Sequence, residues 1–439
     1  MHLRNRPSRI FMSVQVGATT PPIFILSVVR RAVAPERMRR FSMIALLLTP
    51  VYVAVNLYLF WRINGWVRAW FPAFRTVRHW AAPVAVYTFF ALSFLIAFVL
   101  KNSPLRRAMK QIGNYWLGVM LYLLLTVALA DLGRLVLVQL LHLHMLRSAA
   151  VHRTVGCAVA AVLAAVSVLG VVNARIIRVT PYEITVNKQV SGSSTMKVVL
   201  LADLHLGYNI GAGQMQRMVE QVNAQDADLV VIAGDIFDNE WAAVQNPDAI
   251  AEILRAIRSK YGVYACYGNH DVEEPVLAGF TFGGKQEKAS SPEMDAFLAQ
   301  ANIHLLHDSG VQLPNGVYLY GRADKNRPGR GITVRQTPQE ITAGLNPAQP
   351  VFVIDHEPGE LQALADAGVD VDFGGHTHNG QMFPGNLTIR LFWENACGHV
   401  QKGAMHSIVT SGVGLFGPNM RVATRAEICP ITVHFSAED

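Results

Sequence analysis

The 439-residue chain has few cysteines, no internal repeat and no low-complexity tract. The cysteines show neither a CxxC pair nor the spacing of a zinc site, so they are expected to be buried structural thiols; they are Cys157, Cys266, Cys397 and Cys429. Three of them fall in the second half, and an odd number of thiols there favours a reducing compartment.

Acidic residues are almost absent from the first half. Residues 1–174 contain 19 lysines and arginines but only two acids, Glu36 and Asp131, whereas residues 175–439 contain 19 basic and 29 acidic residues. The formal net charge of +7 therefore describes neither half. The basic residues flank apolar segments and form no groove-like run, so a membrane is favoured and no nucleic-acid partner is expected. Length and charge together predict two units.

Four stretches are long and apolar enough to cross a hydrocarbon core of ~30 Å as helices, which satisfy their own backbone. They are Met43–Trp61, Ala81–Leu100, Tyr115–Leu141 and Thr154–Ala174. Tyrosines and tryptophans near their ends are typical of an interfacial belt. The third stretch contains Asp131 and Arg134, which lie three apart and are expected to pair. These stretches predict a membrane domain over residues 43–174, with about four helices, after a basic extension of residues 1–42.

The basic residues between the spans predict the orientation. With the N-terminus inside, 14 of them lie on the inner side and six on the outer side. The positive-inside rule then places the acidic half in the cytoplasm, at the cell (inner) membrane. Ile10–Val29 is weaker as a fifth span because it contains Gln15 and the pair Pro21-Pro22. A basic extension, or a true start codon further along, is the preferred explanation of this segment.

Residues 175–439 alternate between apolar strands and helical patterns, which predicts an α/β fold with a largely buried sheet and helices on its faces. The expected strands are Val198–Ala202, Leu229–Ala233, Val263–Tyr267, Val351–Ile354 and Val369–Phe373. The expected helices are Gln214–Asn223, Pro247–Lys260 and Gly359–Ala367. Every chemically suggestive motif begins where a strand ends, at the usual ligand-binding edge of such a sheet.

Five short motifs follow these strands. They are Asp203-Leu204-His205, Gly234-Asp235, Gly268-Asn269-His270-Asp271, Asp355-His356 and Gly375-His376-Thr377-His378. In an extended chain, residues i and i+2 point the same way, so the two Asp/His or His/His partners of a motif are expected to face one ion. Gly234 and Gly375 allow the backbone to approach closely. Imidazoles together with carboxylates suit manganese, iron or zinc. Each motif alone is weak, but the ordered set predicts two divalent metal ions.

In number, order and local residues these motifs resemble the calcineurin-like metallophosphoesterases, and the resemblance covers residues 175–439. It implies β-sandwich-like sheets flanked by helices. It also implies the metal ligands: one ion on Asp203, His205 and His378, the other on Asn269, His356 and His376, with Asp235 bridging them. The implied reaction is attack on phosphorus by a metal-bridging hydroxide. His270 would protonate the leaving oxygen, with Asp271 nearby to orient it.

Further residues resemble the bacterial membrane-linked branch of this family, some members of which have a multi-span N-terminal region. The matching segments are Asp355-His356-Glu357-Pro358, Gly375-His376-Thr377-His378-Asn379-Gly380-Gln381 and Ser411-Gly412-Val413-Gly414 followed by Pro418 and Arg421. A fourth, Gly321-Arg322-Ala323-Asp324, is open between a salt bridge and a substrate contact.

The sequence therefore predicts a membrane-anchored dinuclear-metal phosphohydrolase that cleaves a phosphoester or pyrophosphate bond. A lipid-linked phosphate ester is one of the substrates expected. The alternative is a membrane sensor or scaffold that binds a phosphorylated ligand without turnover. A transporter is disfavoured because Asp131 and Arg134 are the only charges within the predicted spans and the sequence has no evident repeat. No oligomeric state is predicted.

Overall fold

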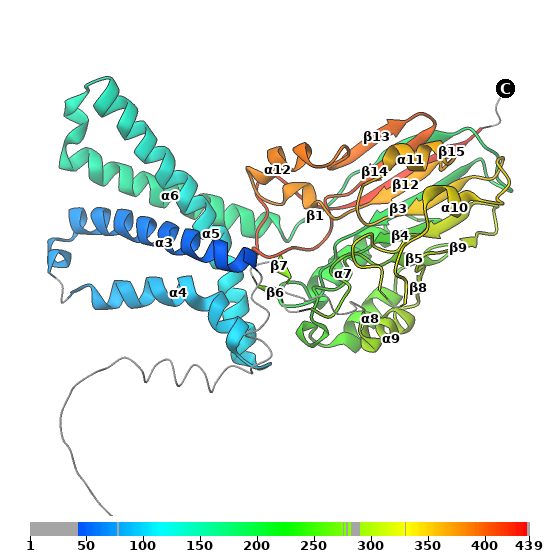
Figure 1. Cartoon of the computed structure of the whole chain (residues 1–439), viewed down its shortest axis with the longest axis horizontal. Helices are drawn as coiled ribbons and strands as arrows, with labels where there is room; N and C mark the ends of the chain where they lie inside the picture. The colour runs from blue at the N-terminus through cyan, green and yellow to red at the C-terminus, as the bar shows by residue number, and fades with distance from the viewer. Residues whose placement is uncertain are drawn as a thin grey trace, which may run out of the picture. The chain divides into compact units, whose positions relative to one another are not determined.

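The computed structural model describes residues 43–76, 79–274, 276–277, 280–281, 290–329 and 331–436. The predicted basic extension and the segment Ile10–Val29 lie outside these residues. The described part of the chain begins with long helices and continues as an α/β domain (Figure 1). The long helices are α3 (Met43–Trp70), α4 (Ala81–Val99), α5 (Pro104–Arg134, continued by a π-helical turn, Leu135–Leu140) and α6 (Ala149–Asn173).

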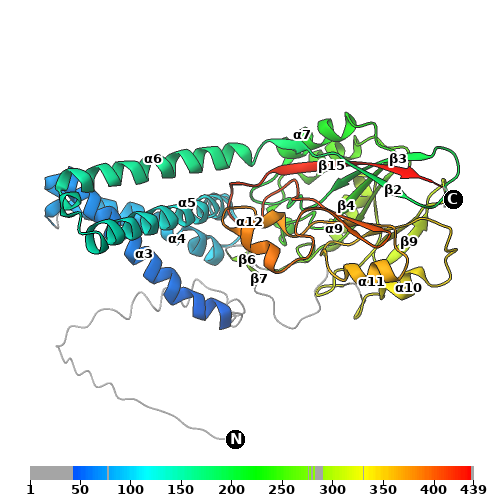
Figure 2. The ribbon, with the colours of Figure 1, turned by 90° about the horizontal axis from the view of Figure 1, so that it is seen from above.

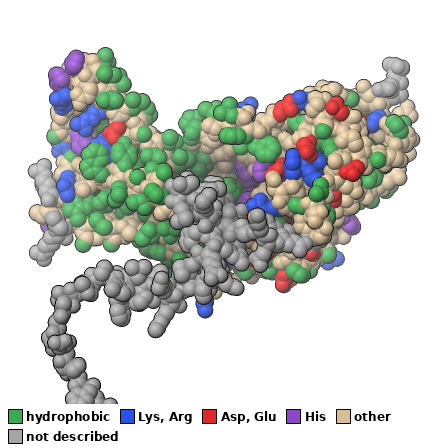
Figure 3. Space-filling view, viewed as in Figure 1, with side chains coloured by type: hydrophobic (Ala, Val, Ile, Leu, Met, Phe, Trp, Pro, Cys, Tyr) green, Lys and Arg blue, Asp and Glu red, His purple; other side chains and the backbone are tan. Residues whose placement is uncertain are grey.

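Three of these helical segments are long and apolar enough to cross a membrane: Ala81–Val99, Pro104–Leu140 and Ala149–Asn173. They contain all but the final residue of each of the last three predicted spans. The first predicted span, Met43–Trp61, lies within α3, so the count of four spans stays a prediction. Hydrophobic side chains dominate the surface of these helices, whereas charged side chains are spread over the α/β domain (Figure 3). Such a surface fits lipid around the helices.

Asp131 does not take the partner expected from the sequence. Its carboxylate pairs with Arg62 of α3 and accepts a hydrogen bond of 2.7 Å from the hydroxyl of Tyr58. The Arg62 guanidinium also lies over the rings of Trp61 and Trp66, 5.4 and 5.3 Å from their centroids. The expected pair with Arg134 is therefore wrong. An ion pair between two helices neutralises the charge of the buried Arg62 with a half-buried carboxylate, which a pair along one lipid-facing helix does not.

Two sheets form the α/β domain. The first has the strand order β1-β15-β3-β4-β5-β8, with β2 also paired to β15. From β3 to β8 its strands are parallel, and β15 is antiparallel to β3. The bounds are β1 Ile177–Val179, β2 Tyr182–Val186, β3 Thr195–Leu201, β4 Leu229–Ala233, β5 Val263–Cys266, β8 Ile303–Leu305 and β15 Ala426–Phe435.

The second sheet has the order β13-β14-β12-β11-β10-β9, parallel in its middle and antiparallel at both edges. Its bounds are β9 Ser309–Gln312, β10 Tyr318–Gly321, β11 Val351–Ile354, β12 Val371–Gly374, β13 Gly398–Lys402 and β14 Met405–Val409. A short hairpin, β6 (Val276–Leu277) and β7 (Phe280–Thr281), stands apart from both sheets.

The two sheets pack face to face, with helices on the outer face of each (Figures 1 and 2). Side chains such as Leu200, Val231 and Phe352 fill the space between the sheets. The outer face of the first sheet packs on α7 (Ala212–Asn223), α8 (Pro247–Arg255) and α9 (Pro292–Gln300), and the outer face of the second packs on α10 (Pro338–Thr342) and α11 (Leu361–Asp366). The expected sandwich of sheets flanked by helices is confirmed.

The predicted strands and helices lie close to the observed ones. Strands β4 and β11 have the predicted bounds. The helix predicted to reach Lys260 ends at Arg255. The following residues bond to the segment before β4 instead, because the amides of Lys260 and Tyr261 donate to the carbonyls of Ala227 and Asp228. Those bonds align the chain for β5.

Candidate metal centre

The predicted site residues meet at one end of the two sheets, in the loops after β3, β4, β5, β11 and β12. Backbone hydrogen bonds tie these loops to one another: the amide of Asp203 donates to the carbonyl of Gly234 at 2.9 Å, and that of Gly375 to the carbonyl of His356 at 3.1 Å. The second of these bonds joins the loops after β11 and β12. Parallel strands thus bring motifs from distant parts of the sequence to one place.

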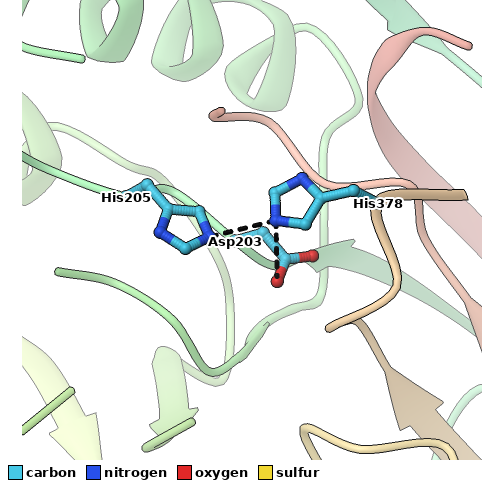
Figure 4. Close-up of side chains that lie close together, drawn as sticks. All are labelled: Asp203, His205 and His378. Atoms are coloured by element: carbon cyan, nitrogen blue, oxygen red, sulfur yellow. Dashed lines mark hydrogen bonds and ion pairs between the residues drawn. The ribbon is translucent and has the colours of Figure 1, made fainter. Parts of the chain in front are cut away.

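One group of donors consists of Asp203, His205 and His378 (Figure 4). The two Nε2 atoms of the histidines lie 3.0 Å apart, and that of His378 lies 3.7 Å from Oδ1 of Asp203. All three side chains are buried, and Oδ2 of Asp203 has no hydrogen-bond partner. Buried donors that face one another with lone pairs in excess fit a cation held between them.

A second group consists of Asn269, His356 and His376. The Oδ1 of Asn269 lies 3.1 Å from Nε2 of His356 and 2.9 Å from Nδ1 of His376. The Nδ1 of His356 lies 2.8 Å from the carbonyl oxygen of Ala233. That contact assigns the ring proton to Nδ1, which leaves Nε2 free to bind a metal ion.

Asp235 lies between the two groups. Its Oδ2 is 3.2 Å from Nε2 of His356 in the second group and 3.7 Å from Nε2 of His205 in the first. Its Oδ1 accepts a 2.7 Å hydrogen bond from the amide of His270. Asp203 and His378 are grouped with His205, and Asn269 and His376 with His356, so the carboxylate of Asp235 lies between the two groups of predicted ligands.

The backbone reaches this arrangement differently from the prediction. Five of the seven residues have positive φ angles, namely Asp203 (54°), His205 (47°), Asp235 (50°), His376 (70°) and His378 (49°). The motifs are therefore not extended, because each strand ends just before its motif and the chain turns sharply there. Such left-handed residues are costly, and they are concentrated at functional sites.

The predicted roles of two glycines are confirmed. Gly234 has a φ of 74°, and a Cβ placed on it would lie 2.7 Å from Nδ1 of His356. A Cβ on Gly375 would lie 2.5 Å from that of Ala202. Neither position has room for a side chain, so both glycines let the loops of the site pack against each other.

His270 lies beside the first group, with its ring centroid 5.1 Å from that of His205. Its Nδ1 contacts Oδ1 of Asn239 and lies 4.0 Å from Oδ1 of Asp238. The carboxylate of Asp271 instead accepts hydrogen bonds from the amides of Phe237 and Gly268, at 2.8 and 2.7 Å. Asp271 thus braces two loops, and the structure does not bring its carboxylate to the imidazole as expected.

Asp238 and Asn239 were not among the predicted site residues. Asp238 also lies 3.6 Å from Nδ1 of His205, so it faces two histidines of the site. Both residues follow Asp235 within four positions on the loop after β4. Asp238 could have been noticed in the sequence as a second acid three residues after Asp235. A short loop at a strand end keeps all its polar side chains near the site.

Burial dominates the electrostatics of the centre. It raises the pKa of Asp203 to about 6 and lowers the pKa of His376 to about 3. Burial also lowers the pKa of His378, with the charge of His205 adding to the effect. At Asp235 burial acts in the opposite direction, but the charges of His356 and His270 hold its pKa well below the usual range. Burial therefore favours neutral rings at His376 and His378. At His356 and His205 burial acts the same way, but the carboxylates of Asp235 and Asp238 outweigh it and raise the pKa of both rings, so a metal ion would displace a proton from each.

Arg322 forms a buried ion-pair network rather than an open contact with the centre. Its guanidinium lies 2.7 Å from Oδ2 of Asp355 and 2.9 Å from Oε2 of Glu360. Arg335 binds the other oxygen of Asp355 at 3.0 Å. Asp324 accepts from backbone amides of its own loop. These contacts favour the salt-bridge interpretation and hold the residue that precedes His356 in place.

Residues 196–380 match the calcineurin-like phosphoesterase family. Together with the fold and the gathered donors, this match shows that the chain carries a calcineurin-like metallophosphoesterase domain.

Similar proteins have names that refer to a metallophosphoesterase or a pyrophosphatase. A Danio rerio protein named "Transmembrane protein with metallophosphoesterase domain" is 30% identical over 290 residues, which cover 62% of this chain and 61% of that protein. A metallophosphoesterase of Aquifex aeolicus is 26% identical over 58% of this chain and 92% of its own length. A Chlamydia trachomatis protein named as a UDP-2,3-diacylglucosamine pyrophosphatase is 22% identical over 47% of this chain and 70% of its own length. The chain thus spans about three-fifths of the Danio rerio relative.

Proposed function

We propose that this protein is a membrane-anchored phosphohydrolase that works with two divalent metal ions. The observation that carries the proposal is the position of Asp235, whose Oδ2 faces a histidine of each donor group. Asp203, His205 and His378 would hold one ion, and Asn269, His356 and His376 the other. The mixture of imidazole, carboxylate and amide favours manganese, iron or zinc. When bound, such a metal pair lowers the pKa of water and neutralises charge on a phosphoryl group.

His270 is proposed as the residue that protonates the leaving oxygen. Burial lowers its pKa to about 4, so the ring is neutral near pH 7 without substrate. A phosphate group placed beside it would add negative charge and raise that pKa. The ring could then carry the proton that a poor leaving group needs. Asn239 and Asp238, the side chains nearest its Nδ1, are better placed to orient the ring than Asp271.

The substrate is proposed to be a phosphoester or a pyrophosphate. A lipid-linked substrate is supported by the helices that precede the domain and by the printed name of the Chlamydia trachomatis relative. The short connection supports it as well, since α6 ends at Asn173 and β1 begins at Ile177. A domain tethered by so few residues stays at the membrane surface, where headgroups are concentrated.

The proposal is tested by hydrolysis of mono-, di- and pyrophosphate esters by the full-length protein in nanodiscs. Activity should disappear after chelation and return when manganese, iron or zinc is added back. Asp235→Asn serves as the inactive control. A protein that binds phosphorylated ligands in the metal-loaded state but turns over none of these esters would instead be the sensor or scaffold of the alternative hypothesis.

We further propose that the domain faces the cytoplasm, because the basic residues of the predicted inner segments outnumber those of the outer segments. Residues 101–114, which include the start of α5, form one of these inner segments, and Arg106 in this segment binds Glu240 of the domain. A reporter that fluoresces only in the cytoplasm, fused after Asp439, should be bright, and an export-dependent phosphatase fused there should be silent. The reverse pattern would contradict the orientation.

A further inference from the structure

Exposed hydrophobic side chains of the α/β domain are concentrated in one short segment. Of the seven large hydrophobic residues exposed after Asn173 in the described part of the chain, four lie between positions 383 and 392. They are Phe383, Leu387, Leu391 and Phe392. The segment forms α12 (Gly385–Thr388) and a 3-10 turn (Ile389–Leu391), and hydrophobic side chains gather over it (Figure 3). We call residues 383–392 the apolar lobe. A soluble domain rarely exposes such a group of side chains without a partner.

The apolar lobe is joined directly to the metal centre. It begins five residues after His378 and ends just before Trp393, whose ring centroid lies 5.2 Å from that of His376. The hydroxyl of Thr377, between these two histidines, donates to the carbonyl of Ala396 at 2.5 Å. Both ends of the lobe are thus anchored next to metal-binding side chains. A ligand that touches the lobe lies beside the site.

The apolar lobe is also joined to the membrane helices. The hydroxyl of Tyr122 on α5 donates to the carbonyl of Phe383 at 3.1 Å. Tyr122 lies seven residues inside the predicted span Tyr115–Leu141, which is ~10 Å along a helix. The first residue of the lobe therefore lies at the depth of an apolar part of α5.

The chain after the lobe makes the same helix contacts. A Cβ placed on Gly118 of α5 would come within 2.7 Å of the Met420 side chain, and one on Gly170 of α6 within 2.8 Å of Val422. Val422 forms a β-bridge with Met382, the residue before the lobe. Two helices thus approach the base of the lobe closely, each through a glycine.

We propose that the apolar lobe inserts into the lipid leaflet beside the metal centre. Its depth on α5 and its composition both favour lipid over a protein partner, because Arg390 is its only charged residue and is exposed. An arginine among leucines and phenylalanines can extend to the headgroups while its neighbours contact acyl chains. On this arrangement, a headgroup phosphate reaches the centre without leaving the bilayer. That consequence rests on the proposed function, whereas insertion of the lobe does not.

The insertion is tested by the depth of a spin label at Leu391→Cys in the full-length protein in nanodiscs. Val334→Cys is the matched control, since Val334 is 82% exposed and Leu391 is 81% exposed. The exposed Cys157 is replaced by alanine in both variants, and the parent with Leu391 supplies the background signal. Oxygen should relax the label at 391 more than a water-soluble nickel complex does, with the opposite order at 334. Equal nickel accessibility at both positions would overturn the proposal.

A second measurement tests the consequence for catalysis. Leu391→Asp combined with Phe392→Asp should reduce hydrolysis of a phospholipid phosphoester in bilayers by about tenfold or more, because insertion delivers the headgroup. Hydrolysis of a soluble nitrophenyl ester should stay within about twofold of wild type, as it should for Val334→Asp. Unchanged hydrolysis of the lipid, or an equal loss on both substrates, would contradict delivery through the lobe. A wild-type protein inactive on every ester would contradict the proposed function, while the label depths would still decide insertion.

Discussion

The membrane helices and the α/β domain use acidic side chains in opposite ways. In the helices, both oxygens of Asp131 have a partner, Arg62 for one and Tyr58 for the other. In the metal centre, Oδ2 of Asp203 is buried without a hydrogen-bond partner, and the imidazoles of His205 and His378 face each other. A satisfied charge holds two helices together, whereas an unsatisfied group of donors keeps capacity for a cation. The difference separates a structural from a chemical role.

Asp235→Asn should have the largest effect on activity. An amide in place of the shared carboxylate removes the negative charge between the two donor groups, so at least one metal ion should be lost and hydrolysis abolished. The membrane helices should stay folded, because the polar contacts of this side chain are with loop residues of the site, His205, His270 and His356. Phosphate release measures the loss of hydrolysis, and circular dichroism measures whether the helices stay folded. Near-normal turnover with two bound metal ions would disprove the bridging role.

His270→Ala should reduce turnover by ~10²–10⁴-fold on esters with poor leaving groups. The loss should be much smaller on nitrophenyl esters, whose leaving group needs no proton. The kcat of each substrate class checks this difference. Asp271→Asn is the informative comparison: its carboxylate braces backbone amides, so it should change thermal stability more than the leaving-group dependence. If His270→Ala slowed both classes equally, the residue would have a binding or structural role.

Asp131→Leu tests the other side of the comparison. It leaves Arg62 buried among helices without its carboxylate, and should lower the melting temperature on the order of 5 °C. Arg134→Leu is the matched control and should lower it less, since the ion pair joins Asp131 to Arg62. Metal content and hydrolysis of soluble esters should be unchanged in both variants. A larger loss from Arg134→Leu would favour the pair expected from the sequence.

Asp372→Asn should have the smallest effect, and near neutral pH it should raise the stability of the protein rather than lower it. Burial, together with the charge of Asp355, raises the pKa of Asp372 to about 7. This carboxyl group keeps its proton in the folded protein but ionises in the unfolded chain from about pH 4 upward. The folded protein therefore loses stability as the pH rises from about 4 to about 7. The amide removes that loss and can still accept the hydrogen bond from Ser407. The difference between melting temperatures at pH 5 and pH 8 should shrink. An unchanged difference would contradict the buried, protonated carboxyl group.

The parts of the structure that the sequence predicted best are those set by local pattern. Strands β4 and β11 are short, wholly apolar runs between polar motifs, so their bounds could be read directly. The meeting of the candidate ligands at one end of the sheets could be predicted because each motif follows the end of a strand. The partner of Asp131 could not, because Arg62 lies on another helix and pairing between helices leaves no local signal.

Two other features could not be predicted from the sequence, because they too depend on how distant segments pack. The bracing role of Asp271 depends on how the loops after β4 and β5 pack. The hydrophobic residues of the apolar lobe have the composition of a buried segment, and only the structure shows that they are exposed.

The number of metal ions per chain tests the central claim most directly. The full-length protein, purified without chelators and supplied with manganese, iron or zinc, should contain two transition-metal ions per chain by elemental analysis. Asp131→Leu should keep both ions, and Asp235→Asn should lose at least one. A wild-type protein that binds at most one ion at saturation, or an Asp235→Asn variant that keeps two, would contradict a dinuclear centre built around Asp235.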